Sequence, residues 1–111
     1  MKVFVLAAVL AAAGLVGLPL HAAEVRVLAT NAAAEIMADL APQFEAQTGH
    51  KLAVTSEPTN AIVARIRNGE TADAVILIKT AMDELRTSGR IVPDSAADLA
   101  TTHLAVAVRK G

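Results

Sequence analysis

The sequence predicts an α/β fold, built on a mainly parallel sheet with helices on both faces. Beyond residue 23, extended apolar runs alternate with segments of helical spacing. The helical segments end at Gly49, Gly69 and Gly89, and glycine is the residue that most often follows a helix. Neither an internal repeat nor a low-complexity linker interrupts the order β-α-β-α-β-α-β, which is typical of parallel strands joined by crossover helices.

The first segment of the chain is set apart by its composition. Lys2 is followed by the apolar run VFVLAAVLAAAGLVGL (3–18), then by Pro19 and small residues. A basic start, an apolar centre and small residues before a polar start predict a secretory signal peptide, and the run is slightly short for a membrane span. We expect residues 1–23 to be the signal peptide, with cleavage after Ala22 or Ala23; an uncleaved N-terminal anchor is the alternative.

Composition limits the partners of the mature chain. The full chain has 10 basic and 11 acidic residues, and the mature net charge is near −2 because Lys2 leaves with the signal peptide. There is no basic stripe and no aromatic platform for bases, so we expect no nucleic-acid partner and no membrane insertion after cleavage. The sequence has no cysteine. An exported chain of about 88 residues must then be stabilised by one small core.

The first predicted elements of the mature chain are a strand and a helix. Residues 24–29 alternate polar and apolar and then run apolar, as a strand entering a core does. Residues 32–49, AAAEIMADLAPQFEAQTG, have apolar residues at i, i+4 and i+8, which form a helical stripe. Pro42 removes one backbone hydrogen bond from that helix and predicts a kink. The stripe consists of Ile36, Leu40 and Phe44.

The next elements repeat this alternation. Residues 51–56 are predicted to form the second strand, and residues 61–68 a short helix. Residues 73–78 are the least polar stretch after the signal peptide, which is typical of a strand covered on both faces. The apolar side of the short helix is formed by Ile62, Val63 and Ile66.

The last part of the chain contains two capping patterns and one apolar run. Residues 80–83, TAMD, resemble a capping box that opens a helix through residues 85–88. Residues 95–98, SAAD, repeat the pattern and predict a helical turn. Residues 104–108, LAVAV, predict a final strand.

Three strand-to-helix junctions are chemically alike. They are Thr30-Asn31-Ala32, Pro58-Thr59-Asn60 and Ile78-Lys79-Thr80, and they carry small hydroxyl or amide side chains and no acid. Ligands of open parallel sheets bind beyond the carboxyl ends of the strands. Helix N-termini have unpaired N–H groups and a partial positive charge, so three that converge would suit an anion. Ordinary N-capping is the alternative, and in it Thr59 or Asn60 caps the second helix.

Longer motifs relate the chain to a known family. The segments VRVLATNAAAEIMADLAPQFEAQTGHKL, ARIRNGETADAVIL and MDELRTSGRIVPDSAADLATTHLAVAVRKG follow one another in this order. Together they resemble the N-terminal part of a type 2 periplasmic substrate-binding protein of ABC importers, of the molybdate-binding family. The resemblance implies the first of two α/β lobes that close on a tetrahedral oxyanion. It also implies a periplasmic monomer that works with an ABC permease and needs no cofactor.

The resemblance also implies a ligand and a set of ligand-binding residues. The ligand would be a small oxyanion, molybdate or tungstate, held by hydroxyls and backbone N–H groups without a counter-charge. Thr59 stands where the family has a ligand-binding hydroxyl, and Ile78 would offer its backbone N–H. At the first junction Ala32 replaces the serine usual in molybdate binders, which keeps a backbone donor and removes a hydroxyl. The implied ligand-binding residues are Thr30, Asn31, Ala32, Thr59, Asn60 and Ile78.

The resemblance ends at Gly111, before a second lobe. We therefore expect residues 24–111 to be a truncated substrate-binding lobe with the second lobe missing, which by itself binds its ligand weakly. An enzyme is the rival class, but His50 and His103 have no cysteine or serine at motif spacing and no metal-ligand spacing appears, so we expect no catalysis. A binding protein for a different small anion and a small exported interaction domain remain as alternatives.

Overall fold

The computed structural model describes residues 22–111, so the predicted signal peptide lies almost entirely outside the described residues. The described chain alternates strands and helices, in agreement with the predicted order as far as the third helix. The elements are β1 (Glu24–Thr30), η1 (Asn31–Ala33), α1 (Ala34–Thr48), β2 (Lys51–Glu57), α2 (Thr59–Arg67), β3 (Ala74–Ile76) and α3 (Lys79–Thr87). Between residues 22 and 111, no helix is both long and apolar enough to cross a membrane.

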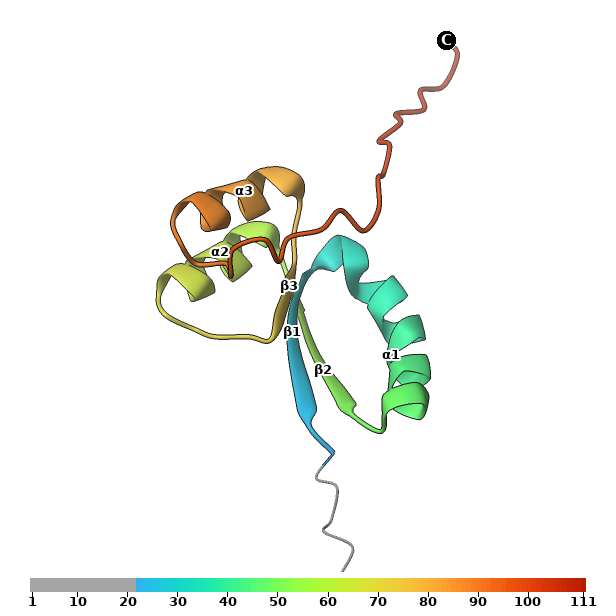
Figure 1. The fold of residues 1–111 in the computed structure, drawn as a ribbon. Helices are drawn as coiled ribbons and strands as arrows, with labels where there is room; N and C mark the ends of the chain where they lie inside the picture. Colours follow the sequence, from blue (N-terminus) through green and yellow to red (C-terminus); the bar gives the residue numbers. More distant parts are fainter. Residues whose placement is uncertain (1–21) are drawn as a thin grey trace, which may run out of the picture.

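The three strands of the described chain form one parallel sheet in the order β2-β1-β3. The register pairs Thr30 with Glu57 across β1 and β2, and Ala29 with Ile76 across β1 and β3. Helix α1 lies on one side of the sheet, and α2 and α3 lie together on the other (Figure 1). The predicted fold class, a parallel α/β sheet with helices on both faces, is therefore confirmed.

The core lies between β1 and the pair α2 and α3. Ile62 and Leu85 are the largest side chains that are fully buried there. Burying such a side chain contributes about 1.5–3 kcal/mol, so this side of the sheet holds most of the stabilising apolar contact. The predicted apolar side of α2 is confirmed. The core cluster consists of Leu28, Ile62, Val63, Ile66, Ala81 and Leu85.

Helix α1 packs against the sheet with a different side from the one that its large apolar residues predicted. Ile36 is 57% exposed and Leu40 is 47% exposed, so these two residues of the predicted stripe lie outside the core, and only Phe44 is half-buried. Alanines and one methionine, also at helical spacing, lie toward β2 instead. Small side chains let the helix lie close to the strand, and the spacing alone did not distinguish the two stripes. The residues of α1 and β2 that line the hollow between them are Ala34, Met37, Ala38, Ala41, Leu52, Val54 and Ser56.

The helix continues through Pro42 and ends at Gly49. Gly49 has a φ of 71°, the left-handed conformation that closes many helices, and its N–H donates to the carbonyl of Glu45 at 2.9 Å. The predicted end of this helix is confirmed.

Strand β3 is shorter and more open than the sequence indicated. Its ladder covers only Ala74–Ile76, and no residue of it is fully buried. The prediction of a strand covered on both faces is wrong. Val75 packs against the core cluster, but among the described strands β3 pairs with β1 alone, so its other side is open to solvent.

The sequence after β3 departs further from the predictions. Helix α3 begins at Lys79 with Ile78 as N-cap, so the predicted capping box at residues 80–83 starts two residues inside the helix and does not cap it. Residues 95–98 form no helical turn and residues 104–108 form no strand. They belong to an extended tail that leaves the sheet (Figure 1), in which Leu104 is 97% exposed. An apolar run does not make a strand unless a neighbouring strand supplies the ladder hydrogen bonds.

Candidate functional site

The carboxyl ends of the three strands lie at one edge of the sheet, because the strands are parallel. At that edge β1 leads into η1 through Thr30, β2 into α2 through Pro58, and β3 into α3 through Ile78. All three junctions singled out in the sequence therefore lie on the same side of the molecule. This edge, between the strand ends and the helix starts, is the candidate site.

Two of the junctions are in direct contact. The hydroxyl oxygens Oγ1 of Thr30 and Thr59 are 3.2 Å apart and share a hydrogen bond in which either can donate. Both side chains are half-buried. A hydroxyl has one proton to donate, so the bond uses one of the two protons and leaves the other for a further acceptor. The pair therefore offers one hydrogen-bond donor at the carboxyl edge of the sheet.

The helix starts around this pair are not capped by side chains. In the described chain, none of the three N-cap residues, Thr30, Pro58 and Ile78, makes a side-chain cap hydrogen bond. Proline occupies the N-cap of α2, so Thr59 is the first helical residue and its hydroxyl is directed to Thr30. The alternative of ordinary capping by Thr59 or Asn60 is therefore wrong. The first N–H groups of these helices are left to solvent or to a ligand.

The other predicted site residues lie at the same edge and are open to solvent. Asn31 and Ala32 are exposed in η1, and Asn60 is exposed in the first turn of α2. Ile78 is 55% exposed, and its extended backbone places it directly before α3. Ala32 offers no side-chain donor, so at the first junction the only hydroxyl is that of Thr30. The arrangement is an open rim of donors and not an enclosed cavity.

One acid at this edge was missed in the sequence. Glu57 is the last residue of β2 and the register partner of Thr30. Paired residues of parallel strands project to the same face of a sheet, so the side chains of Glu57 and Thr30 lie on the same face, next to each other along the rim. The junction was counted from Pro58 onward, which left Glu57 out. Its presence means that an anion at the rim would approach a negative charge unless that charge is neutralised.

A guanidinium from α2 meets that carboxylate. Arg65 Nη1 lies 3.0 Å from Glu57 Oε1, and Arg65 Nε donates to Glu70 Oε2 at 2.6 Å. The hydrogen bond to Glu70 is the main reason that the pKa of Arg65 lies above its ordinary value. Arg26 Nη2 in turn lies 3.6 Å from Glu70 Oε1. These four residues form a chain of ion pairs with two positive and two negative charges, so it is formally neutral.

The two histidines considered as catalytic candidates lie away from the edge. His50 precedes β2, and its Nδ1 accepts a hydrogen bond of 3.1 Å from the backbone N–H of Ala23 at the amino ends of the strands. His103 lies in the exposed tail. Over residues 22–111, no three His, Asp or Glu residues are grouped closely enough to hold a metal ion.

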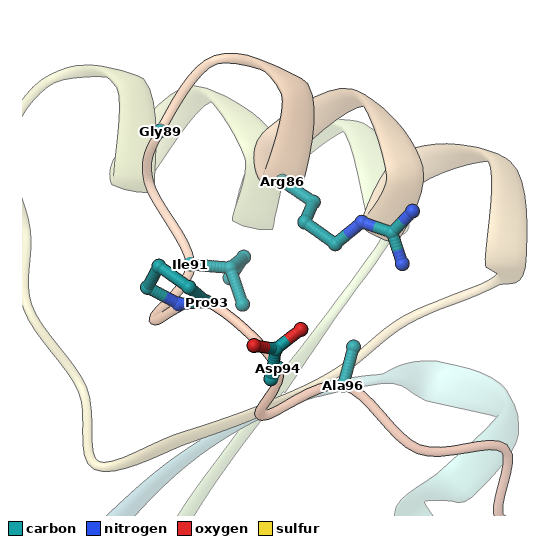
Figure 2. A pocket seen from close by; sticks show the side chains of 6 residues that line it. All are labelled: Arg86, Gly89, Ile91, Pro93, Asp94 and Ala96. Carbon is teal, nitrogen blue, oxygen red and sulfur yellow. The ribbon is translucent and has the colours of Figure 1, made fainter.

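A hollow of about 590 Å³ lies elsewhere in the described chain. It is formed by the last turn of α3 and the segment that follows, with Arg86 and Asp94 on opposite sides (Figure 2). Asp94 has a φ of 60°, the left-handed region, which marks a tight turn there. The lining includes none of the predicted site residues. It consists of Arg86, Gly89, Ile91, Pro93, Asp94 and Ala96.

Comparison with known proteins gives a family match over almost all of the described chain. A family model described as bacterial extracellular solute-binding protein matches residues 25–111. A curated relative, an aconitate isomerase from a Pseudomonas species, is 34% identical over 90 residues. The match covers 77% of this chain and 34% of the relative, so this chain spans about a third of that relative's length.

Proposed function

This chain belongs to the bacterial extracellular solute-binding protein family, and from that premise we propose that it binds a small oxyanion as the extracytoplasmic component of an ABC importer. The proposed site is the rim at the carboxyl edge of the sheet. Its proposed ligand-binding groups are the hydroxyls of Thr30 and Thr59 and the first N–H groups of η1, α2 and α3.

The observation that carries this proposal is the contact between Thr30 and Thr59. Two hydroxyls from segments 29 residues apart meet at 3.2 Å, directly beside helix starts that no side chain caps. Capping does not account for these hydroxyls, because neither bonds to a helix N–H. An acceptor-only ligand placed at the rim would take the remaining hydroxyl proton and several N–H bonds at once.

A deprotonated oxyanion fits these groups for a simple reason. All of its oxygens are acceptors, and hydrogen bonds to an ionised acceptor are about twice as strong as neutral ones. The partial positive charge at helix N-termini favours a negative ligand further. Among oxyanions, molybdate and tungstate are proposed from the resemblance of the sequence motifs, and sulfate has the same tetrahedral shape.

The direct test is an isothermal titration calorimetry experiment in which residues 24–111 are titrated in turn with molybdate, tungstate and sulfate. We expect saturable heat with at least one of the three and none with chloride at the same ionic strength. Because a ligand that binds only the native state raises its melting temperature, thermal unfolding is an independent readout. If none of the three tetrahedral anions produces binding heat or a shift in melting temperature, the proposed function is refuted.

A second candidate ligand is an organic carboxylate. The relative described above is named an aconitate isomerase, and a carboxylate accepts the same hydroxyl and N–H bonds as an inorganic oxyanion. Titration with aconitate under the same conditions distinguishes the two classes. Stronger binding of aconitate than of the tetrahedral anions would favour the carboxylate.

We propose that the chain binds without catalysis. His50 lies at the opposite end of the strands, and the nearest carboxylate, Glu57, is paired with Arg65. His50 is therefore too far from the rim to move a proton there, and the Glu57 carboxylate is already held by a guanidinium. Incubation with aconitate, followed by proton NMR, is expected to show no isomerisation. Conversion that scales with protein concentration would contradict this.

Export and partners follow from the same proposal. Residues 1–23 would direct secretion and be removed, and the mature chain would act as a monomer that delivers its ligand to an ABC permease. Mass spectrometry of the exported protein is expected to find a mature N-terminus at Ala23 or Glu24. Light scattering after gel filtration tests the monomer.

A further inference from the structure

We propose that Arg65 is a positioning residue that holds and neutralises Glu57, and thereby keeps the rim open to an anion. The inference rests on the proposed function, since it concerns the electrostatics of the same site. It assigns a role to a residue that is not among the proposed ligand-binding residues.

The need for such a residue arises from the register of the sheet. Glu57 is paired with Thr30, so the two Cα atoms lie about 4.8 Å apart and their side chains project to the same face. An anion held by the Thr30 hydroxyl would therefore come close to the Glu57 carboxylate. At about 8 Å, one uncompensated negative charge weakens the binding of a dianion about sixfold even at the dielectric constant of bulk water, and more at the lower effective dielectric constant of a protein surface, so a loss of about tenfold or more is expected.

The contacts of Arg65 are suited to removing that penalty. Its Nε is fixed by the 2.6 Å hydrogen bond to Glu70, which orients the guanidinium so that Nη1 lies 3.0 Å from Glu57 Oε1. The Nη1 atom is buried and faces the Glu57 carboxylate, so the positive charge of Arg65 lies directly against the negative charge of Glu57. Glu70 has a second cation, Arg26, at 3.6 Å. The charge of Arg65 is therefore available to Glu57.

A merely structural role is the competing explanation. Arg65 joins α2 to the end of β2, and an ion pair between two partly exposed side chains contributes little to stability. If that link were its whole role, removing the negative charge of Glu57 would not repair the loss of Arg65. If Arg65 acts by neutralising Glu57, removing the negative charge of Glu57 would restore the binding that the loss of Arg65 weakens. The two explanations therefore differ in the double variant.

The experiment compares Arg65→Gln, Glu57→Gln and the double variant with the unchanged chain, by calorimetry with molybdate and sulfate at low ionic strength. Arg65→Gln is expected to weaken anion binding about tenfold or more. The double variant is expected to return to within about threefold of the unchanged chain. Arg67→Gln is the matched control, because Arg67 lies on the same helix and pairs with Glu84 of α3 instead. It changes the net charge equally and is expected to leave binding within about twofold.

The outcomes separate this inference from the proposed function. A double variant as weak as Arg65→Gln would overturn neutralisation, and so would an Arg67→Gln variant that weakens binding equally. If the unchanged chain binds no anion, the proposed function is refuted and the role at the rim falls with it.

Discussion

Replacing Thr59 by valine tests the candidate site most directly. The change keeps the branched shape of the side chain and removes the hydroxyl that meets Thr30 at 3.2 Å. Because Pro58 is the N-cap, the variant leaves the start of α2 intact. A selective loss of ligand binding is therefore expected, with little effect on the fold.

The expected magnitudes follow from the two kinds of hydrogen bond involved. The Thr30–Thr59 bond joins neutral hydroxyls and, at 3.2 Å, is longer than the usual O–H···O distance, so its loss costs at most about 1 kcal/mol of unfolding free energy. Thr30 is only half-buried and can bond to water in the variant. A hydrogen bond to an ionised ligand contributes about 1.5–3 kcal/mol, which corresponds to a loss of affinity of about 10- to 150-fold.

The assay combines calorimetry with molybdate and urea unfolding followed by circular dichroism. Thr87→Val is the control, since it removes a hydroxyl at the far end of α3 that donates to the carbonyl of Asp83. It is expected to change stability by a similar small amount and affinity not at all. Unchanged affinity in Thr59→Val, or an equal loss in both variants, would refute the reasoning.

Three further predictions concern the fold. Ile62→Ala removes a fully buried side chain and is expected to lower the free energy of unfolding by about 2–5 kcal/mol in urea titration; a change below about 1 kcal/mol would show that the core collapses around the gap. Gly49→Ala forces a side chain into a left-handed conformation where nothing lies within 4 Å, so only backbone strain acts, and a cost of about 1–2 kcal/mol should lower the melting temperature by several degrees. Deleting residues 99–111, whose apolar side chains are exposed, is expected to shift the melting temperature by no more than about 2 °C, and a larger fall would mean that the tail packs in solution.

The parts of the fold that could be predicted from sequence are those governed by local chemistry. Strands β1 and β2 have the length and apolar content of strands, and α2 has its apolar residues on one side, so each was located within a few residues. Gly49 ended α1 as expected because few residues other than glycine adopt its φ without strain. These features depend on a residue and its near neighbours.

Other parts depended on which segments lie side by side. The apolar run at residues 104–108 has the pattern of a strand but has no strand beside it in the described chain, so it stays extended. Helix α1 has two apolar stripes, and packing against β2 selected the one with small side chains over Ile36 and Leu40. Which of the two stripes packs against the sheet cannot be predicted from a single sequence.

The sequence by itself determined the kinds of donor at the candidate site: hydroxyls and helix N–H groups at the ends of parallel strands. Only the tertiary structure decided that Thr30 and Thr59 touch, that no side chain caps the described helix starts beside them, and that Glu57 lies next to Thr30 with Arg65 against it. The physical reason is that the donor types follow from local residue chemistry. Contacts between segments tens of residues apart follow from strand register and helix packing, which the order of residues alone does not display.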